Sequence, residues 1–210
     1  MVISILFITA LANSAYAIIA PFLPFEFNRK SIDQSWIGYI FSAYSMAVIL
    51  GSPVVGYLMP VIGRRNLIII GMLIMGTSFI LFGLTSYIEN NQAAFIILSL
   101  INRFLQGLGS SFIQTTMYSI STNFYPDNKE TMIGYIEAVT GIGFILGPLL
   151  GSLLFYIGGY RFIFFFVGTL FIILCPFIKC IFKKNIDESC DKIIEESKNK
   201  LSQSIIYEED

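Results

Sequence analysis

Two charged residues lie inside long apolar stretches of this sequence. Arg103 stands within LINRFLQGLGSSFIQ (residues 100–114), and Glu137 stands within the apolar stretch of residues 132–157. An arginine at membrane depth costs roughly 3 kcal/mol or more, and it is rarely kept without a partner or a water-filled cavity. A carboxylate at that depth can take up and release a proton. These two residues therefore suggest the binding of charged groups and protons inside a membrane.

The residues around Arg103 are spaced as one helix face. Gln106, Ser110 and Gln114 follow Arg103 by three, seven and eleven residues, with Gly107 between them. Residues at these intervals share one side of a helix. A polar side within a membrane predicts contact with water or with a substrate path. The alternative for Arg103 is a structural role, in which it only hydrogen-bonds backbone carbonyls of a neighbouring helix.

Two further residues complete the predicted substrate and proton path. Asn13 places hydrogen-bonding groups at mid-depth in the first apolar stretch, with Tyr16 one turn later. Asn13 has an interhelical hydrogen bond as its alternative role. Glu137 lies about two turns into its helix, and its alternative is a carboxylate close enough to the membrane surface to stay hydrated. The predicted path comprises Asn13, Arg103, Gln106, Gln114 and Glu137.

Composition identifies the class of protein. Of the 210 residues 55% are hydrophobic and 13% are charged, whereas soluble domains carry about 25% charged residues. The net charge of −1 makes nucleic acid an unsuitable partner. The chain has no histidine, which excludes Ser–His and Cys–His nucleophile pairs, His-ligated haem and HExxH metal sites. We expect an integral membrane protein that is not an enzyme and has no cofactor or metal site.

Six segments are long enough to cross about 30 Å of hydrocarbon as helices. They are Val2–Leu23, Trp36–Met59, Leu67–Tyr87, Ala93–Ile120, Met132–Ile157 and Phe162–Phe182. The predicted fold class is an all-α membrane protein, with six transmembrane helices in residues 1–184. Residues 185–210 are rich in acids and are predicted to form a tail, either a solvated linker or an amphipathic helix.

The basic residues predict the orientation in the membrane. Six of them lie on one side, in the 2–3 turn, the 4–5 turn and after the sixth span, and three lie on the other, namely Arg29, Lys30 and Arg161. The positive-inside rule then places both termini and the acidic tail in the cytoplasm. The predicted location is the plasma membrane or the membrane of an intracellular vesicle or vacuole.

An internal repeat predicts how the six helices are related. Residues 53–63 and 148–158 both read PxxGxLxxxIG and end the second and fifth spans. Because the two copies end on opposite sides of the membrane, they indicate two three-helix units of inverted topology, as in many secondary transporters. The alternative is that Gly and Pro are simply frequent at the ends of membrane helices.

Three segments carry a resemblance to a known family, the major facilitator superfamily of transporters. The stretch from Gly56 through Gly63, Arg64 and Arg65 resembles the family's loop 2–3 signature GxLaDrxGRK. NRFLQGLGSS (residues 102–111) is similar to the fourth-helix signature RxxqGxGa, and GIGFILGPLLG (residues 141–151) resembles the fifth-helix signature GxxxGPxxG. The residues of this last signature, Gly143, Gly147, Pro148 and Gly151, lie on a ridge of small residues that favours close helix packing.

The resemblance implies that residues 1–184 form the N-terminal six-helix half of such a transporter. APFLPFE (residues 20–26) and IEAVTGIGFILGP (residues 136–148) are similar to the vesicular amine and polyamine branch and to drug/proton antiporters. That branch implies organic cations exchanged for protons, with the Arg103 face on the substrate or proton path. It also implies that the glycine ridge packs against the other half.

Two departures from the family pattern qualify this interpretation. Pro60 replaces the family's loop 2–3 acid and Val61 replaces the following arginine, so the charge cluster that stabilises the outward-facing state must be built differently or be absent. The family also has twelve helices, which predicts a second six-helix half as a partner, besides the lipid bilayer, the substrate and protons. A non-transporting six-helix scaffold, or the truncated relic of a transporter, is the alternative function.

Overall fold

The computed structural model describes residues 2–88 and 91–181, so the predicted tail of residues 185–210 lies outside the described residues. The described part is built from α1 (Val2–Arg29), α2 (Ser35–Ile62), α3 (Arg64–Thr85), α4 (Gln92–Phe124), the short 3-10 helix η1 (Pro126–Asn128) and α5 (Lys129–Ile181). Within these residues, five helices are long and apolar enough to cross a membrane.

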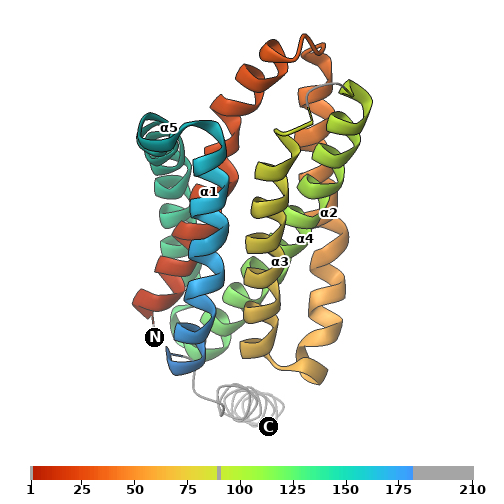
Figure 1. Ribbon diagram of the computed structural model, residues 1–210. Helices are drawn as coiled ribbons and strands as arrows, with labels where there is room; N and C mark the ends of the chain where they lie inside the picture. The colour runs from red at the N-terminus through yellow and green to blue at the C-terminus, as the bar shows by residue number, and fades with distance from the viewer. Residues whose placement is uncertain (1, 89–90, 182–210) are drawn as a thin grey trace, which may run out of the picture.

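The element α5 contains two of the six predicted spans. It has 53 residues, or about 80 Å of helix at ~1.5 Å per residue, more than twice the thickness of the hydrocarbon. Gly159 interrupts it with a φ of 75° and a ψ of −172°, a conformation outside the helical range. The chain turns back at this point (Figure 1), so that residues 129–158 form the fifth span and residues 160–181 the sixth. The prediction of six transmembrane helices is confirmed.

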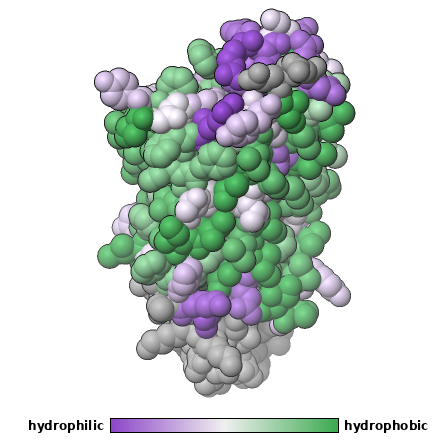
Figure 2. All heavy atoms as spheres, viewed as in Figure 1, coloured by the Kyte–Doolittle hydropathy of each residue, from purple (hydrophilic) through white to green (hydrophobic). Residues whose placement is uncertain are grey.

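The surface has the pattern expected of a bundle that crosses a bilayer. The start of α1, the α2–α3 turn, the α4–α5 connection and the end of α5 lie at one end of the bundle, and the other turns lie at the opposite end (Figure 1). A broad hydrophobic band covers the middle of the visible face, and hydrophilic residues gather toward the two ends (Figure 2).

Helix packing follows the inverted repeat. The extensive contacts join α1 to α5, α2 to α4, and α3 to both α4 and α5. Exchanging spans 1–3 with spans 4–6 converts the pair 1/5 into the pair 4/2, so two of these interfaces are equivalent. The pair of spans 3 and 6 maps onto itself, and there Gly76 and Gly168 approach each other: a Cβ at either would lie within 3 Å of the other's carbonyl oxygen. Two inverted three-helix units therefore account for the packing.

Glycines end the second and fifth spans in both copies of the repeat. Gly63, with φ 86° and ψ 146°, separates α2 from α3 in a conformation that residues with a Cβ avoid. The repeat pairs Gly63 with Gly158, but the positive φ of the second copy is at Gly159. The second turn thus comes one residue later than the repeat predicts.

The glycine ridge packs within this chain, against α1. A Cβ at Gly143 would lie 2.9 Å from the carbonyl oxygen of Ala10, and a Cβ at Gly147 would lie 2.6 Å from that of Ser14. Gly151 meets the ring of Phe22 in the same interface. The expectation that this ridge packs against the other half was therefore wrong: the small residues bring the backbones of the first and fifth spans together.

The first helix is longer than predicted, and this difference buries an acid. The predicted span ends at Leu23, yet α1 continues through Pro21 and Pro24 to Arg29, because membrane helices tolerate proline when their neighbours satisfy the freed backbone groups. Glu26, which the prediction left in a loop, is 1% exposed. Its Oε1 lies 2.9 Å from Arg29 Nη2 and 3.6 Å from Lys30 Nζ.

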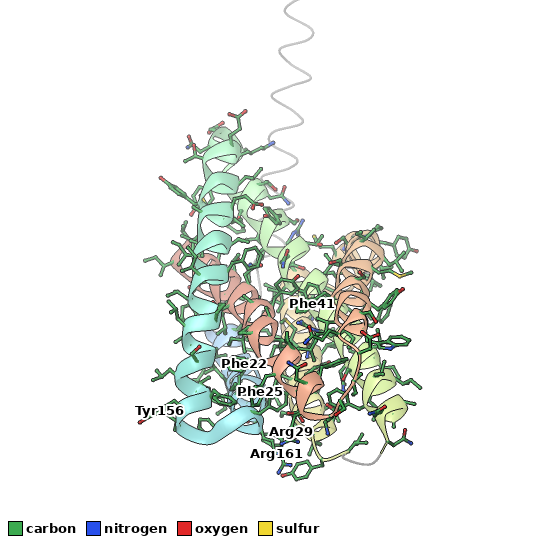
Figure 3. All side chains as sticks on the ribbon, turned by 90° about the horizontal axis from the view of Figure 1, so that it is seen from above. Phe22, Phe25, Arg29, Phe41, Tyr156 and Arg161 are labelled. Carbon is green, nitrogen blue, oxygen red and sulfur yellow. The ribbon has the colours of Figure 1, made fainter. Side chains whose placement is uncertain are left out.

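These charges belong to a cluster that joins the three turns at this end of the bundle. Lys30 Nζ donates to the carbonyl oxygens of Ser86 and Ile88, at 3.3 and 2.5 Å, and Arg161 Nε donates to Ser86 Oγ at 2.9 Å. We call Glu26, Lys30, Ser86 and Arg161 the loop clamp. Arg161 and Arg29 project at the same edge when the bundle is viewed from this end (Figure 3). The three basic residues that weaken the positive-inside bias thus all have structural partners.

Candidate substrate site

One pocket of about 360 Å³ brings together residues from four of the six spans. It lies among α1, α2, α4 and the fifth span, while α3 and the sixth span contribute none of its lining. Its lining residues are Asn13, Tyr16, Tyr44, Ser45, Val48, Ile49, Gln114, Tyr118, Glu137, Thr140 and Phe144. Three residues of the predicted path, Asn13, Gln114 and Glu137, meet here.

Glu137 is the one charged side chain among the residues that line this pocket. It lies in the first third of the fifth span and is exposed in the isolated chain. Its Oε1 accepts a hydrogen bond from the hydroxyl of Tyr118 on α4. The carboxylate is therefore held at the pocket wall by a residue of a neighbouring helix.

The two amides of the pocket use donor groups internally and leave oxygens to accept. Asn13 Nδ2 donates to the Thr9 carbonyl at 2.8 Å and to Thr140 Oγ1 at 3.2 Å, which occupies both of its N–H groups. Gln114 Nε2 donates to Ser110 Oγ at 2.9 Å. Asn13 thus forms the interhelical bond that was its alternative role, and it lines the pocket as well. The amide oxygens of both residues remain as acceptors for a ligand.

Aromatic rings form another part of the wall. The centroid of the Tyr16 ring lies 4.5 Å from that of Tyr44 and 5.8 Å from that of Phe144. Aromatic faces attract cations through the ring quadrupole. The pocket thus combines π faces with a carboxylate and acceptor oxygens.

Arg103 lies behind this aromatic wall and not in the pocket. Its guanidinium carbon lies 4.7, 5.5 and 5.7 Å from the ring centroids of Phe41, Tyr16 and Tyr44; Phe41 is labelled in Figure 3. Arg103 is fully buried, and its Nη1 donates to Gln106 Oε1 at 3.3 Å. Its Nε and Nη2 have no hydrogen-bond partner among the described residues. Two tyrosines thus separate the buried cation from the pocket.

The polar face of α4 is therefore divided along its length. Arg103, Gln106 and Ser110 are fully buried in the bundle, whereas Gln114 reaches the pocket one turn beyond Ser110. The expectation that this whole face lines water does not describe the chain as folded here. The physical reason is that the aromatic side chains of α1 and α2 cover the half of the face nearer the loop clamp.

The residues of the predicted loop 2–3 motif lie at the opposite end of the bundle from the loop clamp. Arg64 is buried and its Nε lies 3.4 Å from Ser119 Oγ of α4, which ties the α2–α3 turn to α4. Arg65 is half-buried. A Cβ at Gly56 would meet nothing within 4 Å, so the part of α2 that carries this glycine is open. Pro60, which replaces the family's acid, is exposed within α2.

Sequence reasoning missed two residues that the structure brings to prominence. Tyr118 lies one turn after Gln114, so the spacing that selected Gln114 also extends to it. Glu26 is followed by Arg29 and Lys30 at three and four residues, the spacing of helical ion pairs. Both signals were present in the sequence, but the predicted polar face was ended at Gln114 and the predicted first span was ended at Leu23.

Comparison with known proteins agrees with the fold. The model of the Major Facilitator Superfamily matches residues 2–203. The MFS-type transporter SLC18B1 of Rattus norvegicus is 32% identical over 166 residues, which are 79% of this chain and 36% of that protein. Multidrug resistance protein 2 of Bacillus subtilis is 28% identical over 177 residues, covering 80% of this chain and 41% of its own length.

A third relative extends the same pattern to lower identity. The quinolone resistance protein NorA of Staphylococcus aureus is 24% identical over 154 residues, which are 73% of this chain and 37% of that protein. The chain thus spans between 36% and 41% of the length of these three relatives. With a family match over nearly all its residues, and with spans that pack as two inverted three-helix units, this protein belongs to the major facilitator superfamily.

Proposed function

We propose that this chain forms one half of a transporter that exchanges organic cations, in particular amines, for protons. The observation that carries the proposal is the pocket, in which a single carboxylate, Glu137, lies with aromatic rings and amide oxygens. A protonated amine needs acceptors for its N–H groups and a negative charge or π faces for its positive charge. The lining supplies each of these, and the buried cation Arg103 lies behind two tyrosines.

The relatives support the same class of function. One is named an MFS-type transporter and others are named for resistance to multiple drugs or to quinolones. These names describe a transporter and two proteins of resistance to small-molecule drugs. The alternative, a non-transporting scaffold, gives no reason for a pocket that contains a carboxylate between aromatic residues.

Coupling to protons follows from the chemistry of one shared group. Glu137 can hold a proton or can face an ammonium group, and neutralising it with a proton removes the attraction for the cation. Binding of the two is then mutually exclusive at this carboxylate. Alternate occupation of one site on the two sides of the membrane produces exchange of amine for proton.

A second six-helix half is needed to close the pocket. The pocket opens to the surface of this chain, and its exposed rim includes Ser45 and Ile49 of α2 and Glu137 and Phe144 of the fifth span. In an apolar stretch of 18 residues in α2, 22% is buried within the chain, whereas 56% is buried in the corresponding stretches of α1 and α3. Because a polar pocket wall facing lipid is costly, we infer that a second half, in the same chain or another, covers these two helices.

The proposed orientation places both termini in the cytoplasm of a plasma, vesicle or vacuole membrane. In a variant whose native cysteines are replaced by serine, Asn66→Cys on the α2–α3 side should react with a membrane-impermeant thiol reagent only after permeabilisation. Asp33→Cys in the α1–α2 loop should react in intact cells or right-side-out vesicles. Both positions are exposed, so reversed labelling would contradict the orientation.

The function is tested by uptake into proteoliposomes that contain the protein together with its second half. An imposed pH gradient should drive accumulation of a radiolabelled primary amine, and collapse of the gradient with an ionophore should release it. A neutral analogue of the same size, benzyl alcohol against benzylamine, should not accumulate. Equal accumulation with and without the gradient would contradict proton exchange, and no protein-dependent uptake of any amine would favour the scaffold.

A further inference from the structure

Glu137, the charged residue of the pocket lining, is already hydrogen-bonded to the hydroxyl of Tyr118. Tyr118 comes from α4 and Glu137 from the fifth span, and both line the pocket. The phenol donates its one proton to Oε1 of the carboxylate. The charged group that would attract a ligand is therefore already bonded within the empty pocket.

The position of Tyr118 on α4 brings its hydroxyl to this pocket. Its side chain is half-buried, and its ring follows Gln114 by one helical turn on the same face. Its own carbonyl accepts a hydrogen bond from Thr122 Oγ1 at 2.9 Å. No other charged group lines the described pocket, so an ammonium donor and the Tyr118 hydroxyl share Glu137 as their charged acceptor and compete at Oε1.

We propose that Tyr118 is a specificity-determining residue that competes with amines for Glu137 and thereby weakens their binding so that they can be released. The proposal rests on the proposed function of the same pocket. A carboxylate has two oxygens and about four lone-pair sites, so the Tyr118 hydroxyl at Oε1 leaves Oε2 open. An ammonium that bridges both oxygens meets the hydroxyl at Oε1 and must share or displace it. A quaternary ammonium has no N–H group, so it remains at a longer distance among the rings of Tyr16, Tyr44 and Phe144 and leaves the hydroxyl in place.

The competition has a consequence for the transport cycle. Charge-assisted hydrogen bonds to a carboxylate are among the stronger ones in proteins, so the hydroxyl lowers the net gain from amine binding. When the amine leaves, the hydroxyl re-forms its bond and takes the place of the lost contact. Tyr118 therefore raises both the dissociation constant and the dissociation rate for amines that carry an N–H group.

The test compares Tyr118→Phe with the parent protein. Both are purified together with the second half and placed in lipid nanodiscs. The probes are benzylamine and benzyltrimethylammonium, which differ in their N–H groups and not in their ring. Tyr118→Phe should bind benzylamine about tenfold more tightly, the equivalent of one net hydrogen bond, and benzyltrimethylammonium with unchanged affinity. In exchange assays KM and the maximal rate for benzylamine should both fall.

Two controls separate this role from a general change in structure. Tyr39→Phe removes a hydroxyl from a residue of α2 that is 63% exposed and does not line the pocket, and it should behave as the parent. In a Glu137→Gln background, Tyr118→Phe should no longer change benzylamine affinity, because the group for which the two compete is gone.

The possible outcomes distinguish failure of the Tyr118 proposal from failure of the proposed function. If Tyr118→Phe weakens benzylamine binding, the hydroxyl contacts the ligand directly and the competition is refuted. If Tyr118→Phe leaves benzylamine affinity unchanged while Glu137→Gln still weakens binding, the inference falls and the proposed function stands. If neither parent nor variant binds benzylamine, or if binding does not depend on Glu137, both proposals are overturned.

Discussion

Glu137→Gln is expected to reduce pH-gradient-driven amine uptake to the level seen without a gradient. The amide has nearly the shape of the carboxylate, but it can neither take up a proton nor attract a cation with a negative charge. Exchange driven only by an amine gradient should persist in part, because the aromatic wall and the amide oxygens of Asn13 and Gln114 remain. The measurement is uptake into proteoliposomes containing the assembled protein, with and without an imposed pH gradient.

Two further variants make this expectation specific to position and to chemistry. Glu137→Asp keeps the charge one methylene shorter and should retain part of the coupling. Glu130→Gln removes an acid from the first turn of the same element, outside the pocket, and should couple as the parent does. If Glu137→Gln responds to the gradient as well as the parent, Glu137 has a structural role and the proton is carried elsewhere.

Gly147→Leu is expected to destabilise the bundle by about 3 kcal/mol, the upper part of the range for overpacked cores. A Cβ at this position would lie 2.6 Å from the carbonyl oxygen of Ser14 and 2.7 Å from Cβ of Ala17. The first of these atoms is helix backbone, so no side-chain rotation can relieve the contact, and the first and fifth spans must separate. A lower temperature of thermal aggregation in detergent, and less protein reaching the membrane, are the measurements.

Gly141→Leu provides the matched control in the same span. A Cβ at Gly141 meets nothing within 4 Å, so the same substitution should leave the aggregation temperature of this chain nearly unchanged. If both variants are equally destabilised, the contact between Gly147 and α1 does not explain the loss of stability. The close approach of α1 and the fifth span is then not what requires a glycine at this position.

The sequence predicted the elements of this fold better than their contacts. Apolar length alone was sufficient to find six spans, because a helix that crosses hydrocarbon needs about 20 apolar residues regardless of its neighbours. The repeat PxxGxLxxxIG correctly indicated inverted units, since glycine is needed where the turns adopt positive φ, although the second turn is at Gly159 and not at Gly158. The partner of the glycine ridge was not predictable, because small residues show that some helix comes close without showing which.

The candidate site illustrates the same limit at the level of side chains. Helical spacing assigned Arg103 and Gln114 to one face, but spacing carries no information about what covers each half of that face. The rings of Tyr16, Phe41 and Tyr44, contributed by two other helices, enclose Arg103 and leave Gln114 in the pocket. Long-range packing therefore decided which predicted residues line the pocket.

The loop clamp constrains the order in which this protein can be completed during synthesis. Lys30 emerges from the ribosome with Glu26 and Arg29, so the acid has its local partner while α1 enters the membrane. The carbonyl partners at Ser86 and Ile88 come only after α3, and Arg161 comes after the fifth span. Ile88 follows Lys30 by 58 residues, so at ~5–20 residues per second the interval between them lasts about 3 to 12 seconds. During that interval the lysine has Glu26 nearby on its own helix but lacks its two carbonyl acceptors, so this end of the bundle is completed only after α3 is made.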